Sequence, residues 1–173
     1  MIQRPHPGTL LLVDDEKDIL DILKITLAPK GYRVLTAMDG QEALAIVSGG
    51  EVDAIISDIQ MPFMTGLQLL AEIRGLGIQT PFVIMTAYGD QEYLLEAIRL
   101  CATDFISKPY AEKEVLDVVD RVLKLGLAQR ELENEMETIL SNSGVTRELA
   151  GRIREQRKEI TLLRQMGSRL KRA

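Results

Sequence analysis

The amino-acid sequence predicts an α/β fold in which a parallel sheet carries helices on both of its faces. Two observations predict it. Over residues 1–110, short apolar runs alternate with segments whose apolar residues recur at helical spacing, as in a chain of strand–helix units. Three of the runs, LLLV, AIIS and FVIM, are almost continuously apolar, which is typical of strands buried on both faces.

The apolar runs predict five strands, and the segments between them predict helices. In these segments apolar residues recur three and four positions apart, and glycines mark the returns from helix to strand. The expected strands cover residues 9–13, 33–37, 53–57, 82–86 and 104–107. The helical sets are Ile19, Leu20, Leu23 and Leu27; Ala43, Leu44 and Val47; Leu67, Leu69, Leu70 and Ile73; and Leu94, Leu95, Ile98 and Cys101, the last of which we expect to be packed.

From about Glu112 onward the sequence predicts helix alone. A single helix over 112–140 would be longer than a helix that only covers one face of a domain. Its apolar positions alternate three and four apart, as in a coiled coil, and a second segment over 147–170 has similar spacing after a predicted break near 141–146. We therefore expect a first domain over 8–124 and a helical coiled-coil extension over 125–173. The first seam is Val115, Val118, Val122, Leu125, Gln129, Leu132, Met136 and Ile139.

Composition narrows the class of protein. The 173 residues leave room for one domain and an extension, and 46% hydrophobic residues permit a sizeable core. The net charge of −5 gives no overall case for nucleic-acid binding. The apolar run before Asp14 is too short for a secretory signal or a membrane span. Cys101 is the only cysteine, which suits a reducing compartment. We expect a cytoplasmic protein without a membrane partner.

Polar residues stand where four of the predicted strands end. Asp14 and Asp15 follow the first strand, Asp58 the third, Thr86 ends the fourth, and Lys108 follows the fifth. In an open parallel sheet these ends share one edge, which is where ligands bind. Each residue alone has an ordinary explanation, such as helix capping or a turn. Together they place carboxylates, a hydroxyl and an ammonium in a set that suits Mg²⁺ and a phosphoryl group.

Four stretches, LLLVDDEKDIL, IISDIQMPFMTGLQLL, VIMTAYGD and DFISKPY, resemble the receiver domain of bacterial two-component response regulators, over about residues 8–124. The resemblance implies a flavodoxin-like fold with strand order 2-1-3-4-5. It implies phosphoryl transfer to Asp58 from a partner histidine kinase or histidine phosphotransfer protein. It also implies Asp15, Asp58 and the backbone carbonyl of Gln60 as direct Mg²⁺ ligands, with Asp14 in the outer shell.

The same resemblance implies roles for the remaining residues. Thr86 and Lys108 match the residues that contact the acyl phosphate, and the bond after Lys108 is usually cis in the family. Phe105 matches the aromatic residue that changes rotamer on activation, although it lacks the hydroxyl of the tyrosine often found there. The only histidine, His6, precedes the first strand. We therefore expect a chain that receives a phosphoryl group and has no enzymatic activity beyond its own phosphorylation and dephosphorylation.

Other functions fit the sequence less well. Aspartyl-phosphate hydrolases of the haloacid dehalogenase type carry their nucleophile after the first strand in a D-x-D pattern, whereas here two aspartates are adjacent. Residues 147–173 hold nine Arg or Lys and three Glu, net +6, so a nucleic-acid contact is conceivable. Residues 111–140 hold four basic and eight acidic residues, net −4. These opposite charges favour helix pairing, within one chain or in a homodimer, over nucleic acid. A larger regulator with an effector domain beyond Ala173 is a further alternative.

Overall fold

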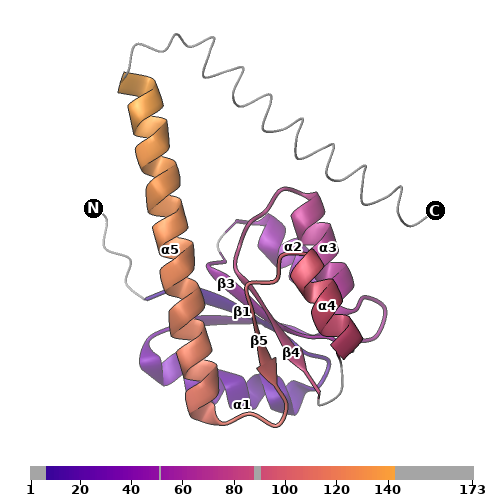
Figure 1. Cartoon of the computed structure of the whole chain (residues 1–173). Helices are drawn as coiled ribbons and strands as arrows, with labels where there is room; N and C mark the ends of the chain where they lie inside the picture. The colour runs from indigo at the N-terminus through magenta and orange to yellow at the C-terminus, as the bar shows by residue number, and fades with distance from the viewer. Residues whose placement is uncertain (1–6, 51, 88–90, 143–173) are drawn as a thin grey trace, which may run out of the picture. The chain divides into compact units, whose positions relative to one another are not determined.

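A computed structural model of the chain (Figure 1) describes residues 7–50, 52–87 and 91–142. The chain divides into two compact units, with the boundary between Gly126 and Leu127. Strands and helices alternate in the first unit, as the sequence predicts. The elements are β1 (Thr9–Val13), α1 (Lys17–Leu27), the short 3₁₀ helix η1 (Ala28–Lys30), β2 (Arg33–Ala37), α2 (Gly40–Ser48), β3 (Ala54–Asp58), α3 (Gly66–Gly75), β4 (Phe82–Thr86), α4 (Gln91–Arg99), β5 (Asp104–Ser107) and α5 (Glu112–Asn142).

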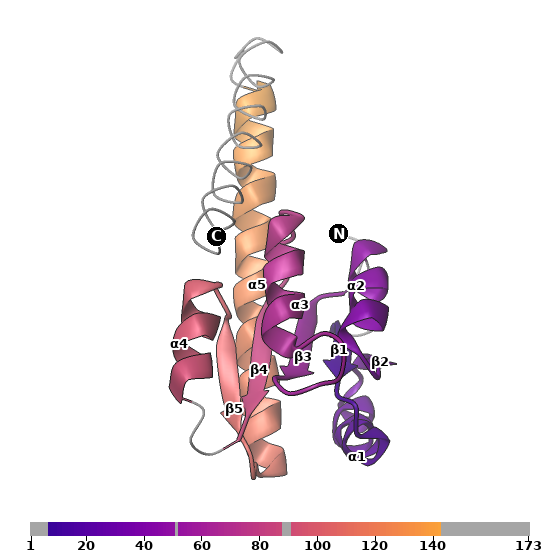
Figure 2. The ribbon, with the colours of Figure 1, turned by 90° about the vertical axis from the view of Figure 1, so that its right-hand side faces the viewer.

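The five strands form one parallel sheet in the order β2-β1-β3-β4-β5, which confirms the predicted α/β sheet and its strand order, while the coiled-coil extension stays a prediction. Four of the predicted strands have the observed bounds. The third lies one residue later than predicted, so Asp58 is the last residue of β3 instead of the residue after it. The helices that connect the strands lie on both faces of the sheet (Figure 2). Helices α2, α3 and α4 cover one face, and α1 and the first part of α5 cover the other.

Two apolar layers hold the sheet between its helices. On one face, alternate strand residues such as Leu11, Ile55 and Ile84 pack with α2, α3 and Ala97 of α4. On the other face, neighbours such as Leu12 and Ile56 pack with α1 and the first part of α5. Because successive strand residues point to opposite faces, burial on both sides requires the continuous apolar runs seen in β1, β3 and β4.

Side-chain caps position the helices that begin at the functional edge of the sheet. Thr65 and Gln68 form a capping box at the start of α3. Asp39 accepts hydrogen bonds from the first amides of α2. Such caps satisfy amides that have no partner inside the helix and are each worth about 1 kcal/mol. They also hold the loops before α2 and α3 in defined positions.

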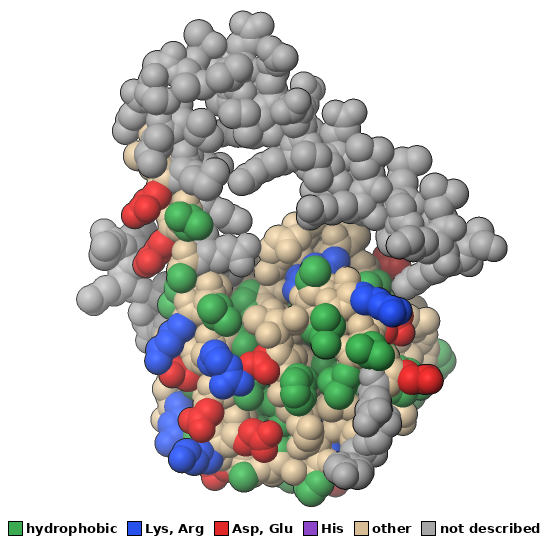
Figure 3. Space-filling model, in the orientation of Figure 1, with side chains coloured by type: hydrophobic (Ala, Val, Ile, Leu, Met, Phe, Trp, Pro, Cys, Tyr) green, Lys and Arg blue, Asp and Glu red, His purple; other side chains and the backbone are tan. Residues whose placement is uncertain are grey.

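Helix α4 differs from the prediction at its C-terminal end. Helix α4 ends at Arg99, so Cys101 lies in the turn that follows the helix, with a φ of 60° and an exposed side chain. The expectation that Cys101 packs on a helix was therefore wrong. Figure 3 shows hydrophobic side chains gathered over α4 and β5. The exposed large hydrophobic residues of these two elements are Tyr93, Leu95, Ile98 and Phe105.

Helix α5 is continuous through the predicted range 112–140 and ends at Asn142. The seam residues Val115, Val118 and Val122 are buried in the core. Farther along the helix, Leu125 and Leu132 are 55% and 60% exposed. His6, the rest of the break near 141–146 and the second helical segment over 147–170 lie outside the described residues. Within the described part of the chain, no helix combines the length and apolar character needed to cross a membrane.

Candidate functional site

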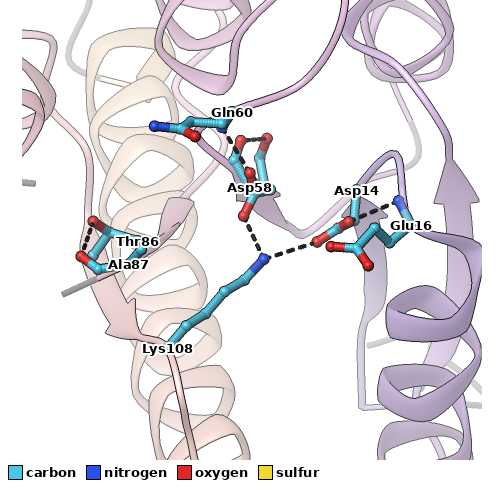
Figure 4. Close-up of polar contacts among 8 residues, drawn as sticks. Asp14, Glu16, Asp58, Gln60, Thr86, Ala87 and Lys108 are labelled. Atoms are coloured by element: carbon cyan, nitrogen blue, oxygen red, sulfur yellow. Dashed lines mark hydrogen bonds and ion pairs between the residues drawn. The ribbon is translucent and has the colours of Figure 1, made fainter.

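The carboxyl edge of the sheet brings Asp14, Asp58 and Lys108 together (Figure 4). The Nζ atom of Lys108 lies 2.5 Å from Oδ1 of Asp58 and 3.3 Å from Oδ2 of Asp14. These residues are far apart in the sequence, and each follows or ends a different strand. The shared edge of parallel strands is therefore what gathers them, as the sequence predicts.

Asp14 is the buried member of this group. Its side chain is almost completely shielded from solvent, and its Oδ1 accepts a hydrogen bond from the backbone amide of Glu16 at 2.9 Å. Burial raises the pKa of Asp14 above its ordinary value, although the Glu16 amide and Lys108 act in the opposite direction. Burial also lowers the pKa of Lys108, but its pairing with Asp58 and Asp14 outweighs that effect and raises the pKa above its usual value.

Both carboxylate oxygens of Asp58 have partners. Oδ1 accepts from Lys108, and Oδ2 accepts from the backbone amide of Gln60 at 2.6 Å. The hydroxyl of the buried Ser57 donates to the backbone carbonyl of Asp58 at 2.9 Å. The carboxylate is therefore held in one orientation at the edge of the sheet, with its oxygens directed toward Lys108 and the loop that follows β3.

Gly66 allows the loop after Asp58 to fold back on β3. A Cβ atom at this position would lie 2.1 Å from the backbone oxygen of Asp58 and 2.9 Å from the hydroxyl of Ser57. No side chain fits there without moving the backbone of β3. The amide of Gly66 donates to the carbonyl of Ile59 at 2.9 Å, which closes the loop at its base.

Thr86 and Lys108 are linked through the backbone. Thr86 is the buried last residue of β4, and its carbonyl accepts from the amide of Lys108 at 2.7 Å. Its hydroxyl donates to the carbonyl of Ala87 at 3.2 Å (Figure 4). The Lys108–Pro109 bond is cis, as the family resemblance implies.

The other predicted site residues lie nearer to solvent. Asp15 is exposed directly after the buried Asp14, and the side chain of Gln60 is exposed while its amide binds Asp58. Phe105 lies on the edge strand β5 with about half of its side chain exposed. The roles predicted for these residues stay predictions.

The donor set suits a divalent cation. In the described residues, no group of three His, Cys, Asp or Glu side chains stands ready to hold a metal. Mg²⁺, however, uses one or two carboxylates and completes its coordination with waters and phosphate oxygens. Asp14 and Asp58 face a single ammonium, which leaves one negative charge before Asp15 is counted. This excess of negative charge at a partly buried edge fits a bound cation.

Sequence reasoning missed several contributors to this site. The backbone amide of Glu16 and the hydroxyl of Ser57 were not singled out, because neither residue type signals such a contact. Phe63, in the loop after Asp58, has a φ of 64° and an exposed side chain. No sequence signal marks that conformation, since it follows from how the loop closes between β3 and α3.

Comparison with known proteins identifies the domain. Residues 10–120, more than half of the chain, match the response regulator receiver domain. The chain is 34% identical over 125 residues to the regulatory protein AtoC of Escherichia coli, covering 72% of this chain and 27% of AtoC. It is 36% identical over 107 residues to the response regulator SaeR of Staphylococcus epidermidis, covering 62% of this chain and 46% of SaeR. The chain thus spans less than half the length of these relatives.

Solved structures show the same similarity. The chemotaxis protein CheY4 of Vibrio cholerae has a TM-score of 0.63 and 35% identity, and the match covers 66% of this chain and 98% of CheY4. NtrX of Brucella abortus has a TM-score of 0.68 and 32% identity, covering 73% of this chain and 29% of NtrX. The shared region is therefore the whole of one small receiver protein and the minor part of a larger regulator.

Proposed function

The chain belongs to the response regulator receiver family, and we propose that it accepts a phosphoryl group on Asp58 from the phosphohistidine of a partner histidine kinase or histidine phosphotransfer protein. In this step, an Asp58 oxygen forms a bond to phosphorus as the N–P bond of the donor breaks, and the electron pair of that bond stays on the imidazole. The observation that carries the proposal is the position of Lys108, whose ammonium contacts Asp58 and Asp14 at once.

The chemistry needs positive charge, because an anionic carboxylate approaches an anionic phosphoryl group. Lys108 supplies one such charge within hydrogen-bond distance of the acceptor oxygen. A bound Mg²⁺ would supply the remainder by offsetting the charge of the phosphoryl oxygens and the carboxylates. We propose Asp15, Asp58 and the backbone carbonyl of Gln60 as its direct ligands, with Asp14 in the outer shell.

The first test measures the mass of the intact chain after incubation with acetyl phosphate and Mg²⁺. We expect one added phosphate on the wild-type chain and none on Asp58→Asn. Asp120→Asn, which changes an exposed aspartate of α5, is the matched control and should label normally. Chelating the Mg²⁺ should also stop labelling. Phosphate on Asp58→Asn would contradict the assignment of the acceptor.

Lys108 and Thr86 are proposed to transmit phosphorylation to the rest of the domain. The backbone amide of Lys108 donates a hydrogen bond to the carbonyl of Thr86. Thr86 also pairs in the sheet with Ser107 of β5, the strand that carries Phe105. A new phosphoryl group that attracts Lys108 and the Thr86 hydroxyl would therefore act on β5. Lys108→Ala and Thr86→Ala should fold normally and lose the conformational response to phosphorylation, as followed by amide hydrogen exchange. Unfolding of either variant would show a mainly structural role.

The output is proposed to run through α5 in a homodimer. Leu125 and Leu132 are exposed core positions of the coiled-coil seam, one heptad apart with Gln129 between them, so pairing with a second copy would bury an apolar stripe. Truncation after Leu125 tests this arrangement by solution mass. A dimer that becomes a monomer supports it, whereas a full-length chain that is monomeric at high concentration favours a hairpin with residues 147–170.

A second candidate is that the chain is the receiver and linker of a larger regulator. The coverage of AtoC and NtrX, at 27% and 29% of their lengths, favours it. In either case we propose a cytoplasmic protein that acts by accepting a phosphoryl group and does not turn over phosphate esters. Steady hydrolysis of small phosphate esters would instead indicate a hydrolase, and nucleic-acid binding that depends on 147–173 would indicate a direct regulator.

A further inference from the structure

Phe63 is the most exposed of the large hydrophobic residues in the described part of the chain. Its side chain is 94% exposed, so it contributes nothing to the core. It lies in the loop that leads from Asp58 to α3. An aromatic side chain held almost wholly in water gains nothing from burial within this chain.

The backbone at Phe63 is also in an unfavourable conformation. Its φ of 64° is in the left-handed region, which bulky residues rarely adopt. The amide of Met64 donates to the carbonyl of Pro62 at 2.7 Å, so Phe63 is the centre of a three-residue turn. Glycine or asparagine would adopt this conformation with less strain. Neither packing nor turn geometry therefore accounts for a phenylalanine at this position.

The loop that carries Phe63 is fixed at both ends. Its beginning is tied to the acceptor through the Gln60 amide and Asp58, and its end through Gly66 and the carbonyl of Ile59. The Thr65 capping box adds a further restraint at the start of α3. The ring is thus presented to solvent from a well-defined backbone that starts at the proposed phosphorylation site.

Two methionines accompany Phe63 in the sequence of this edge of the domain: Met64 follows it directly, and Met38 lies in the loop before α2. Met64 is half-buried and lies against the start of α2, because a Cβ atom at Gly40, the first residue of that helix, would lie 2.7 Å from its side chain. Met38 is 48% exposed. We call Met38, Phe63 and Met64 the apolar rim. Methionine adapts its shape to a partner, and exposed aromatic residues are enriched where protein partners bind most strongly.

We propose that the apolar rim is a contact surface for the protein that delivers the phosphoryl group, with Phe63 as its anchor. The inference rests on the proposed phosphoryl transfer to Asp58. A protein donor must bring its phosphohistidine into bonding distance of Asp58, so its surface must also cover the loop that begins there. A small phosphodonor is recognised by charge alone and gains nothing from an apolar ring. Loss of the apolar rim should therefore slow transfer from a protein donor and leave transfer from a small phosphodonor unchanged.

The test compares two phosphodonors on the full-length chain. Soluble portions of several histidine kinases, each autophosphorylated with ATP, are tried on the wild-type chain, and the fastest donor is kept as the probe. Acetyl phosphate is the second donor. Phe63→Asn removes the ring at a position where asparagine tolerates the backbone, and Phe63→Tyr restores an aromatic ring. Leu76→Asn is the matched control, because Leu76 is 59% exposed just after the other end of α3.

We expect Phe63→Asn to reduce kcat/KM for transfer from the kinase by about tenfold, the usual scale for loss of a central aromatic contact. Labelling by acetyl phosphate should stay at the wild-type rate, Phe63→Tyr should regain most of the kinase reaction, and Leu76→Asn should behave as wild type. Equal values of kcat/KM for transfer from the kinase to Phe63→Asn and to the wild-type chain would overturn the inference about Phe63. The proposed phosphorylation of Asp58 would still stand. Equal losses with both donors would place Phe63 in the reaction itself and also overturn it. If no kinase phosphorylates the wild-type chain while acetyl phosphate does, the protein donor of the proposed function fails, and the inference fails with it.

Discussion

The two halves of α5 carry the same apolar periodicity in opposite surroundings. In the first half, Val115, Val118 and Val122 are buried against the sheet and α1. The next described seam residues, Leu125 and Leu132, are more than half exposed. The change takes place within one turn of a continuous helix. Apolar spacing alone therefore predicts that a helix has an apolar face, but it does not predict what covers that face.

The two halves of α5 also stabilise different states, namely the folded receiver domain and an assembly with another helix. A buried valine in the first half contributes to the free energy of folding of the receiver domain. An exposed leucine in the second half can contribute only when another helix covers it, at roughly 1.5–3 kcal/mol for a fully buried side chain. The same substitution in the two halves should therefore affect different measurements, namely unfolding in the first half and self-association in the second.

The largest effect on the folding free energy is expected for a charge introduced into the first half. Val119 is fully buried, so Val119→Asp places an unpaired carboxylate in the core and should cost about 3–5 kcal/mol of folding free energy. Urea unfolding followed by circular dichroism measures the loss. Leu127→Asp is the control, because Leu127 is about half exposed and should change the free energy by roughly 0.5 kcal/mol or less. Equal losses for the two variants would contradict the comparison.

A charge in the second half should act on association instead. Leu132→Asp removes one apolar side chain from each helix of the proposed dimer and should weaken it by about 3–6 kcal/mol, which is two side chains at 1.5–3 each. Sedimentation velocity should show a monomer at concentrations where the wild-type chain is a dimer. The urea unfolding of the receiver should not change. A Leu132→Asp chain that remains dimeric would show that α5 does not form the interface.

A smaller effect is expected at the polar position of the seam. Gln129 occupies a core position of the heptad, where a polar residue specifies register at a cost in stability. Gln129→Leu should tighten the dimer by about 1–3 kcal/mol, measured as a lower dissociation constant. Thr138→Leu, which also replaces a neutral polar residue by leucine but at an exposed position outside the seam, serves as the control for added apolar character. Weaker association of Gln129→Leu would argue that the two helices do not meet along this seam.

The smallest effect is expected where the two halves meet. Alanine at Gly126 gains up to about 1 kcal/mol of helix propensity, but its Cβ would lie 3.0 Å from Cγ of Pro81, which must give way. We expect Gly126→Ala to change the unfolding free energy by less than about 1 kcal/mol. Gly75→Ala, in α3, has open space around its Cβ and should stabilise the domain by about 0.5–1 kcal/mol. A larger gain from Gly126→Ala than from Gly75→Ala would show that Pro81 yields freely.

Much of the fold and of the candidate site could be predicted from the sequence. The bounds of β1 and β4 followed from continuous apolar runs, and those of β3 to within one residue, because a strand covered on both faces is apolar along its length. The meeting of Asp14, Asp58 and Lys108 followed from the same pattern, since parallel strands end at one edge. The family resemblance supplied the strand order and the roles of Thr86, Phe105, Gln60 and Asp15, and these roles remain predictions.

Other features were decided only by the tertiary structure. Asp14 is buried while Asp15 is exposed, although the two are adjacent, because only the first faces Lys108 and the covered edge of the sheet. The positive φ of Phe63 and of Cys101 arises from the closure of loops between elements whose positions the rest of the fold determines. Periodicity is local and can be read along the chain. Burial and loop conformation depend on residues distant in the sequence, and only the folded chain brings those residues into contact.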